Sequence, residues 1–472
     1  MPVITNIGSI AARGFGFESS PLQQNTSPYF IGVFSSPSTE SFYGGYTAIT
    51  NDSSGNIYFA APYVTNSSSN IYIVLTKLTN LGSIVWQKKI YDTTSSSSYF
   101  VYGINVSSTG NISIAVNYQL SNGNFYPSII VCDSSGNVNF AYYLDDGHNQ
   151  SSFGCSFDSS GNIYLLQNYY NNTYSAGAAG VSKYNSSGTL QWQYFYGLNV
   201  TLNNFIGFSI KIDSGSNVLL NCQYNTADVN GSGLIKINSS GTITWDQGYN
   251  VTGTDLFGFG CGVDSSNNVY GTFQSGSYYT DGVYSVIKTD SSGNPQFTKS
   301  WLIQNFTNGT LNFVNSTGLG CTDSSGNTYV GYNYQNNASS NYVIGITKVN
   351  SSGTVVYARQ LSTPGSSTIV SMLTYNVNTN GDYYISFTNN QILDSSSSSK
   401  ACIGVFRANG TVTGTYNIGG VSMTYSSITP TTQTFTGPTP SAHANKYTAS
   451  STINNLSINS SAASLTTIDY AI

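Results

Sequence analysis

The chain has 472 residues, of which 7% are charged and 14% are aromatic, and its formal net charge is −5. Soluble proteins usually carry about 25% charged residues, so this composition offers no basic surface for nucleic acid or an anionic membrane. The aromatic content argues against disorder, because disordered chains are poor in aromatic residues. We expect no membrane span, since no stretch approaches ~20 apolar residues, and no secretory signal, since the start lacks a basic and an apolar region.

Residues 1–40 stand outside any repeat. Within them, Tyr29–Phe34 (YFIGVF) alternates as a strand does and is expected to form a single strand. We therefore predict a short N-terminal anchor or assembly segment that carries one strand.

A repeated hairpin motif organises residues 41–420. Its clearest copy is Ile235–Trp245, where two alternating runs flank a Ser-Ser-Gly turn. The equivalent turn glycines recur at intervals of 52 to 60 residues: Gly82, Gly136, Gly188, Gly241, Gly293, Gly353 and Gly410. Another turn, D-S-S-G-N in Asp52–Asn56, comes earlier in each repeat. We call it the first turn and the Ser-Ser-Gly turn the second turn. Two tight hairpins and one longer loop per repeat predict an all-β, seven-bladed β-propeller of four-stranded antiparallel blades, with short non-repeat segments at both ends.

Two kinds of side chain keep fixed places in the repeat. An aromatic residue follows the second-turn glycine by four positions in six repeats: Trp86, Phe140, Trp192, Trp245, Phe297 and Tyr357. We expect these rings to fill the space between neighbouring blades. A lysine precedes the same glycine by five positions in five repeats: Lys77, Lys183, Lys236, Lys288 and Lys348. Its stem is expected to pack along the sheet with the ammonium in water or on a neighbouring carbonyl; a phosphate-binding ring is the weaker alternative.

Groups that carry chemistry are scarce. The six cysteines contain no C-x-x-C pair and are expected to be buried, without disulfides or metal ligands. Each D-S-S-G-N turn has one acidic residue where a calcium loop needs several, so we expect no metal and no cofactor. Asp145 and Asp146 with His148 form the only local acid–base cluster, and we expect a solvated loop there. The sequence thus predicts a protein that is not an enzyme.

The loops between the second and third strands are rich in Tyr, Ser, Gly and Asn, the residues that binding loops favour. Because tyrosine faces stack on sugar rings, glycan or surface binding is one interpretation, and inert decoration is the other. The candidate binding residues are Tyr126, Tyr169, Tyr170, Tyr174, Tyr278, Tyr279, Tyr334 and Tyr342.

Residues 421–472 lose the repeat and become rich in Thr and Ser, which predicts a strand-rich C-terminal extension. Thr452–Ile458 and Leu465–Ile472 could pair with the N-terminal segment or with a partner chain. Either terminal segment could complete a blade and close the ring.

The repeat D-S-S-G-N-x-Y … I-x-K-x-N-S-S-G-T-x-x-W, over Phe42–Gly420, resembles the seven-bladed bacterial beta-propeller repeat type. The N-terminal MPVITNIGSIAARGFGF resembles the starts of virion structural and tail-fibre-like proteins of tailed bacteriophages. The second resemblance implies a non-enzymatic virion protein, a tail fibre, tip or surface decoration, made in the host cytoplasm and active in host-surface or glycan adhesion. Its implied partners are other virion proteins, bound through residues 1–40 and 421–472 in an oligomeric assembly, and a host surface glycan. The alternatives are a non-classically exported bacterial surface lectin or adhesin and, more remotely, a polysaccharide-degrading enzyme that uses Asp145 and Asp146.

Overall fold

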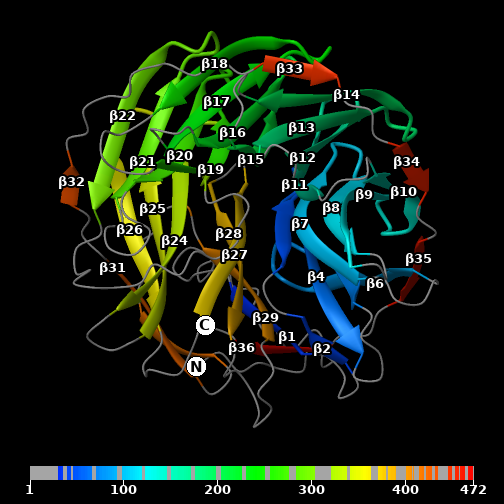
Figure 1. The fold of residues 1–472 in the computed structure, drawn as a ribbon. Helices are drawn as coiled ribbons and strands as arrows, with labels where there is room; N and C mark the ends of the chain where they lie inside the picture. The colour runs from blue at the N-terminus through cyan, green and yellow to red at the C-terminus, as the bar shows by residue number, and fades with distance from the viewer. Residues whose placement is uncertain are drawn as a thin grey trace.

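The computed structural model of the chain is all-β, and the part of the chain that it describes contains no helix (Figure 1). It describes residues 30–35, 40–43, 46–65, 71–92, 98–119, 123–145, 150–171, 176–197, 204–225, 230–249, 256–275, 283–302, 320–336, 341–362, 370–378, 381–389, 400–406, 408, 414–418, 421–427, 431–433, 445–448, 452–455, 458–462 and 466–470. None of the described residues lies in a helix long and apolar enough to cross a membrane.

Seven antiparallel blades of four strands surround a central axis, so the predicted seven-bladed β-propeller is confirmed (Figure 1). From the axis outwards the strands are: blade 1, β3 (Ala48–Asn51), β4 (Ile57–Thr65), β5 (Ile71–Leu78), β6 (Ile84–Asp92); blade 2, β7 (Ser98–Val106), β8 (Ile112–Gln119), β9 (Phe125–Cys132), β10 (Val138–Asp145); blade 3, β11 (Gln150–Phe157), β12 (Ile163–Asn171), β13 (Ala176–Tyr184), β14 (Leu190–Gly197); blade 4, β15 (Asn204–Ile212), β16 (Val218–Asn225), β17 (Asn230–Ile237), β18 (Ile243–Tyr249); blade 5, β19 (Leu256–Val263), β20 (Val269–Ser275), β21 (Val283–Thr289), β22 (Pro295–Leu302); blade 6, β23 (Gly320–Thr322), β24 (Thr328–Asn336), β25 (Asn341–Val349), β26 (Val355–Ser362); blade 7, β27 (Val370–Val377), β28 (Tyr383–Asn389), β29 (Lys400–Phe406), β1 (Phe30–Ser35). A short strand, β2 (Glu40–Phe42), adds to β4.

The N-terminal segment closes the ring. Its strand β1 pairs antiparallel with β29, with Phe30 opposite Val405, and so becomes the fourth strand of blade 7. The last run of the seventh repeat, β30 (Gly414–Ile418), was expected to be the fourth strand of blade 7, but it instead forms a hairpin with β31 (Val421–Ser427) in the sheet of blade 6. Closure by the first strand joins the two ends of the repeat region through hydrogen bonds within one blade.

The C-terminal segment runs around the rim of the propeller (Figure 1). Its strands are β31, β32 (Thr431–Gln433), β33 (Asn445–Thr448), β34 (Thr452–Asn455), β35 (Ile458–Ala462) and β36 (Thr466–Tyr470). Each pairs antiparallel with the outermost strand of a blade: β31 with β26, β32 with β22, β33 with β14, β34 with β10, β35 with β6 and β36 with β1. The sequence left two partners open for Thr452–Ile458 and Leu465–Ile472: within the second stretch, β36 pairs with the N-terminal strand β1, whereas within the first, β34 pairs with β10 of blade 2. We call β31–β36 the belt.

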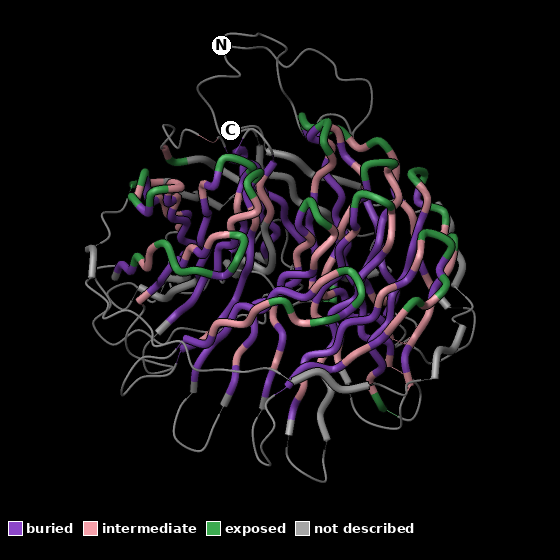
Figure 2. Tube along the Cα trace, turned by 90° about the horizontal axis from the view of Figure 1, so that it is seen from above, coloured by how far each residue is buried: buried purple, intermediate pink, exposed green. Residues whose placement is uncertain are grey.

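The repeated turns are fixed by their own side chains. In blade 3 the Asp158 carboxylate accepts hydrogen bonds from the backbone N–H groups of Ser160 and Asn162 at 2.9 Å. It also accepts from the Asn162 amide at 2.8 Å and from the Tyr164 hydroxyl at 3.2 Å. Gly161 supplies the positive φ of 79° that the turn needs. The turn aspartates are thus structural, and exposed residues gather at the tight turns while buried residues continue along the strands (Figure 2).

The second-turn residues form contacts between neighbouring blades. Lys183 Nζ and Trp192 Nε1 of blade 3 both donate to the carbonyl of Ser239, in the second turn of blade 4, at 3.2 and 3.0 Å. Lys236 and Trp245 of blade 4 do the same to the next turn, at Ser291. Both predictions, rings packed between blades and ammonium groups on a neighbouring carbonyl, are confirmed.

The hydrophobic core lies between the blades and contains the cysteines. One cluster joins Ile57 and Phe59 of blade 1 to Ile403 and Val405 of blade 7, so it also seals the ring. All six cysteines are buried and free, as expected. Burial raises the pKa of the Cys155 thiol to about 11, so this thiol stays protonated at neutral pH. We regard the six cysteines as small apolar core residues.

Candidate functional site on the propeller axis

The innermost strands of four consecutive blades contain a β-bulge at the same place. The pairing register slips by one residue and leaves Tyr102, Phe153, Phe208 and Phe259 as the extra residues. Each precedes the first residue of its blade's first turn by five positions. Since a bulge redirects the side chain of the extra residue, the repeat presents an aromatic ring near the axis in each of these blades.

These four rings and Tyr46 form a continuous aromatic arc. Successive ring centroids lie 5.3 Å apart from Tyr46 to Tyr102, 5.7 Å to Phe153, 5.8 Å to Phe208 and 6.4 Å to Phe259. Tyr46 also contacts Phe100, which contacts Tyr43, a ring that is 41% exposed. The arc therefore extends from the axis to solvent.

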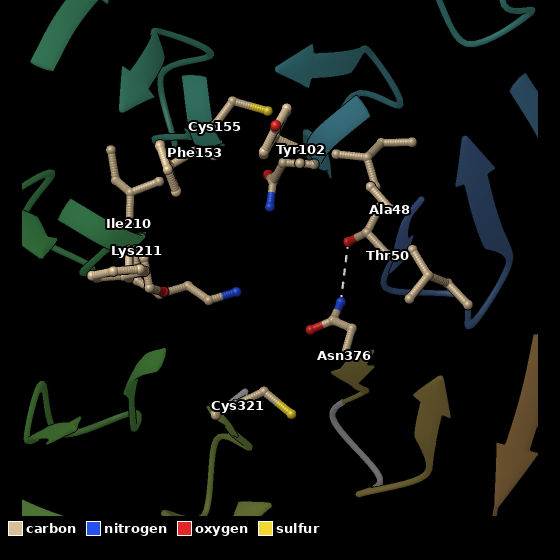
Figure 3. Close-up of a pocket in the computed structure, with 17 residues that line it drawn as sticks. Ala48, Thr50, Tyr102, Phe153, Cys155, Ile210, Lys211, Cys321 and Asn376 are labelled. Atoms are coloured by element: carbon tan, nitrogen blue, oxygen red, sulfur yellow. Dashed lines mark hydrogen bonds between the residues drawn. The ribbon is translucent and has the colours of Figure 1, made fainter. Parts of the chain in front are cut away.

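A cavity of about 80 Å³ lies on the axis, lined by the innermost strands of six blades (Figure 3). Three rings of the aromatic arc, Tyr102, Phe153 and Phe208, contribute to its wall. A second layer, three residues further along the strands, adds Thr50, Asn105, Lys211, Cys321 and Asn376. At about 3.3 Å per residue, the two layers are about 10 Å apart along the axis. We call the arc and this second layer together the axial site.

Lys211 gives the axial site its charge. Its side chain extends from β15 toward the middle of the cavity (Figure 3). The nearest carboxylate along the chain, Asp213, is engaged by Lys236 at 2.9 Å, and no ion pair is seen for Lys211 within the described residues. Buried charges are normally paired, so a partly buried ammonium without a carboxylate is suited to an anionic ligand.

The charge of Lys211 also acts on its surroundings. Burial raises the pKa of the thiols of Cys155, Cys261 and Cys321, and the nearby ammonium of Lys211 partly offsets that rise. Lys211 therefore contributes positive potential to this part of the axis. None of the described residues forms a cluster of three or more His, Cys, Asp or Glu that could hold a metal ion.

Hydrogen-bonding groups surround the ammonium. The Asn376 amide donates to Thr50 Oγ1 at 3.1 Å and to Asn51 Oδ1 at 3.0 Å, which links blade 7 to blade 1 (Figure 3). Burial, and then the neighbouring Tyr46, raise the pKa of Tyr102 well above its ordinary value, although a hydrogen bond with Asn117 opposes the shift. The Tyr102 phenol is therefore neutral at physiological pH and can donate a hydrogen bond.

Of the residues predicted from the sequence to bind a ligand, only Tyr126 has a described side chain, and it does not line the cavity. Tyr126 is 7% exposed and its ring packs on that of Tyr143, with centroids 5.4 Å apart. The other candidates fall outside the described side chains: Tyr169 and Tyr170 on β12, Tyr334 on β24, Tyr342 on β25, and Tyr174, Tyr278 and Tyr279 between strands. Binding by these loops stays a prediction.

The acid–base cluster predicted from the sequence is placed in part. Asp145 ends β10 at the rim of blade 2, opposite Thr452 of the belt, and is far from the cavity lining. Asp146 and His148 lie outside the described residues. The axial site was missed although a signal exists: an aromatic residue recurs five positions before the first turn in four successive repeats.

No protein-family model matches the chain, and no curated protein matches it in sequence. Several solved structures are similar in shape. The polysaccharide lyase Uly1 is 12% identical, with 83% of this chain and 96% of that chain covered and a TM-score of 0.45. An ulvan lyase of polysaccharide lyase family PL25 is 10% identical, with 78% and 95% covered and a TM-score of 0.44. The α-L-arabinofuranosidase Arb93A of Fusarium graminearum is 8% identical, with 81% and 98% covered and a TM-score of 0.40.

This comparison corrects two expectations from the sequence. The chain was expected to be a non-enzymatic bacteriophage virion protein, and the three solved structures named above are instead two polysaccharide lyases and a glycosidase. Nothing in the comparisons supports the resemblance of the N-terminus to tailed-bacteriophage proteins, and the virion location and virion partners that it implied are not carried further. Because the TM-scores are below 0.5, the likeness itself assigns no activity, and the function must rest on the side chains of the axial site.

Proposed function

We propose that the protein is a carbohydrate-active enzyme that acts on an acidic polysaccharide, with the acidic sugar bound at the axial site. The observation that supports the proposal most strongly is the Lys211 ammonium, which lies in the cavity without a carboxylate against it among the described residues. We further propose that the repeats are of the bacterial beta-propeller repeat type, on their D-S-S-G-N and N-S-S-G-T turns.

The two layers of the axial site fit the two parts of a uronic acid. Lys211 can form a charge-assisted hydrogen bond with the carboxylate, and the amide of Asn105 lies in the same cavity wall. The aromatic arc offers ring faces to the apolar face of the sugar. A cavity of about 80 Å³ holds about two or three water molecules, which suits one charged substituent of a polymer that lies outside it.

A uronate whose carboxylate is bound to a cation is activated for β-elimination. Neutralising the carboxylate acidifies the hydrogen on the adjacent ring carbon, C5, and stabilises the negative charge that develops as a water molecule takes up this proton. The C4–O bond then breaks, a C4–C5 double bond forms, and the leaving oxygen takes a proton. Tyr102, a neutral phenol in the cavity wall, is the donor that we assign to that oxygen. The proposed reaction is therefore a lyase reaction.

The test is a panel of acidic and neutral polysaccharides incubated with the full-length protein. We expect an acidic polymer to yield products with the ultraviolet absorbance of an unsaturated uronate, and no neutral polymer to be cleaved. New reducing ends without that absorbance would show hydrolysis and overturn the lyase assignment. Failure to cleave any acidic polymer would overturn the proposal.

Lys211→Met keeps the bulk of the side chain and removes its charge. We expect it to lower kcat/KM by about 10²–10³, the usual cost of one lost stabilising group for a developing anion. Lys88→Met is the matched control, because Lys88 is a partly buried lysine on β6, at the rim and away from the cavity lining, where its ammonium contacts Asn137. Equal activity of the two variants would show that the chemistry occurs elsewhere.

A further inference from the structure

We propose that the rim of the propeller is an acceptor surface for β-strands and that its ligand is the belt, the chain's own C-terminal segment, which binds as one unit and holds the ring closed. This inference is independent of the proposed function. It rests on the backbone pairings of β31–β36.

The belt runs once around the ring and, among the described residues, pairs with every blade except blade 4. Along the chain its strands contact blades 6, 5, 3, 2, 1 and 7, which is the reverse of the order in which the blades were built. In sequence, the belt begins soon after β29 of blade 7, with the β30–β31 hairpin in the sheet of blade 6. It ends with β36 on blade 7. All six pairings are antiparallel additions to the outermost strand. One continuous segment therefore links six blades that otherwise contact only their neighbours.

The last strand of the belt covers the strand that closes the ring. In blade 7 the order is β27-β28-β29-β1-β36, so β1 is an interior strand. Residues 30–34 of β1 pair with β29, and residues 31–35 pair with β36. Without the belt, β1 would be held along one side only. Strands β1 and β36, from the two ends of the chain, thus pair with each other where the ring closes.

The outermost strand of each blade has one edge whose backbone groups must find a hydrogen-bonding partner. An uncovered outermost strand presents unpaired N–H and C=O groups to which another chain can add. Pairing with the belt satisfies the backbone groups within the same molecule and removes that hazard.

The belt should bind with high avidity. Its strands have only three to seven residues, and strands this short do not pair stably when they are isolated in water. When they are linked, each bound strand raises the effective concentration of the next one, so the segment binds far more tightly than its parts. We therefore expect the belt to stay on the ring after the covalent connection is cut.

The first experiment inserts a protease site between Ile418 and Val421 in the full-length chain and cuts it after folding. We expect the fragment that begins at Val421 to co-elute with the ring in native buffer and to separate only in denaturant. The uncut protein with the same insertion is the control. Separation of the fragment in native buffer would overturn the proposal, and so would pairs of rings joined by their fragments, because each belt is assigned to its own ring.

Hydrogen exchange of the unmodified protein tests the same inference if the insertion prevents folding. With both edges of β1 paired, its amides should exchange at least tenfold more slowly than those of the exposed turn residues Ser186 and Ser187. Amides of β6 and β10 should be protected on both edges as well. Exchange of β1 at the rate of that turn would show that the belt does not hold the closing strand.

Discussion

At the scale of single residues, equivalent positions of the repeat have unequal energetic roles. Lys183 and Lys236 occupy the same position in neighbouring blades and donate to equivalent turn carbonyls. Only Lys236 also forms a buried ion pair, with Asp213 at 2.9 Å, and both side chains of that pair are at most 8% exposed. Breaking a buried pair leaves an uncompensated charge, whereas an exposed lysine contributes little.

We therefore predict that Lys236→Met lowers the free energy of unfolding by about 3 kcal/mol, and that Lys183→Met lowers it by less than about 1 kcal/mol. Chemical denaturation of both variants checks this difference. The double variant Asp213→Asn, Lys236→Met should recover part of the loss. If both single variants were equally stable, the ion pair would not contribute.

Asp213 should also make the free energy of unfolding depend on pH. Burial raises the pKa of Asp213, but hydrogen bonds from Asn217 and Lys236 outweigh it, so the net pKa lies below the ordinary value of 3.8. A carboxyl group with a lowered pKa binds more protons when unfolded, so its stabilisation is present above pH 3.8 and is lost as the pH falls through the folded pKa. Denaturation between pH 2 and pH 6 should show a plateau that ends near pH 4, and Asp213→Asn should flatten the fall below it. A fall that began near pH 6 would contradict this account.

At the scale of elements, the second turn combines a backbone requirement with a contact between blades. Gly241 has φ of 83°, and a Cβ there would lie 2.5 Å from the Tyr194 ring of the preceding blade. Gly123 has the same φ of 83° but meets nothing within 4 Å of such a Cβ. The two glycines therefore separate backbone strain from packing.

Substitution by alanine should cost about 1–2 kcal/mol at Gly123, from the left-handed backbone alone. At Gly241 the displaced ring should add about 1–3 kcal/mol. Thermal unfolding of Gly123→Ala and Gly241→Ala measures the difference. Equal losses would mean that the turn does not transmit packing between the blades.

The elements also show what the sequence could and could not predict. The turns were predictable because residues such as Asp158 and Gly161 fix the turn through contacts within the turn itself. The number of these turns along the chain gives the number of blades. The bulged rings were not recognised, because the extra residue at Phe153 or Phe208 breaks the two-residue alternation by which a strand face is identified. Lys211 has no counterpart in the other repeats, so periodicity could not single it out.

At the scale of the whole molecule, both non-repeat ends become part of the propeller. The sequence left open which end closes the ring, because β1 carries no repeat motif and pairs with a strand about 370 residues away. The belt was not foreseen as a circuit either, since strands of three to seven residues are held by backbone pairing and have little pattern of their own. These long-range pairings leave the axis as a rigid, closed frame around Lys211.

The most direct test of the central claim is a structure of the protein in complex with an oligosaccharide of the acidic polymer that it cleaves. The account predicts that the carboxylate of one uronate lies within hydrogen-bond distance of Lys211 Nζ, with the sugar against the aromatic arc. It also predicts that Lys211→Met binds this oligosaccharide at least tenfold more weakly than Lys88→Met. An oligosaccharide bound only at the rim or at the Tyr-rich loops, with the axial cavity unoccupied, would contradict it.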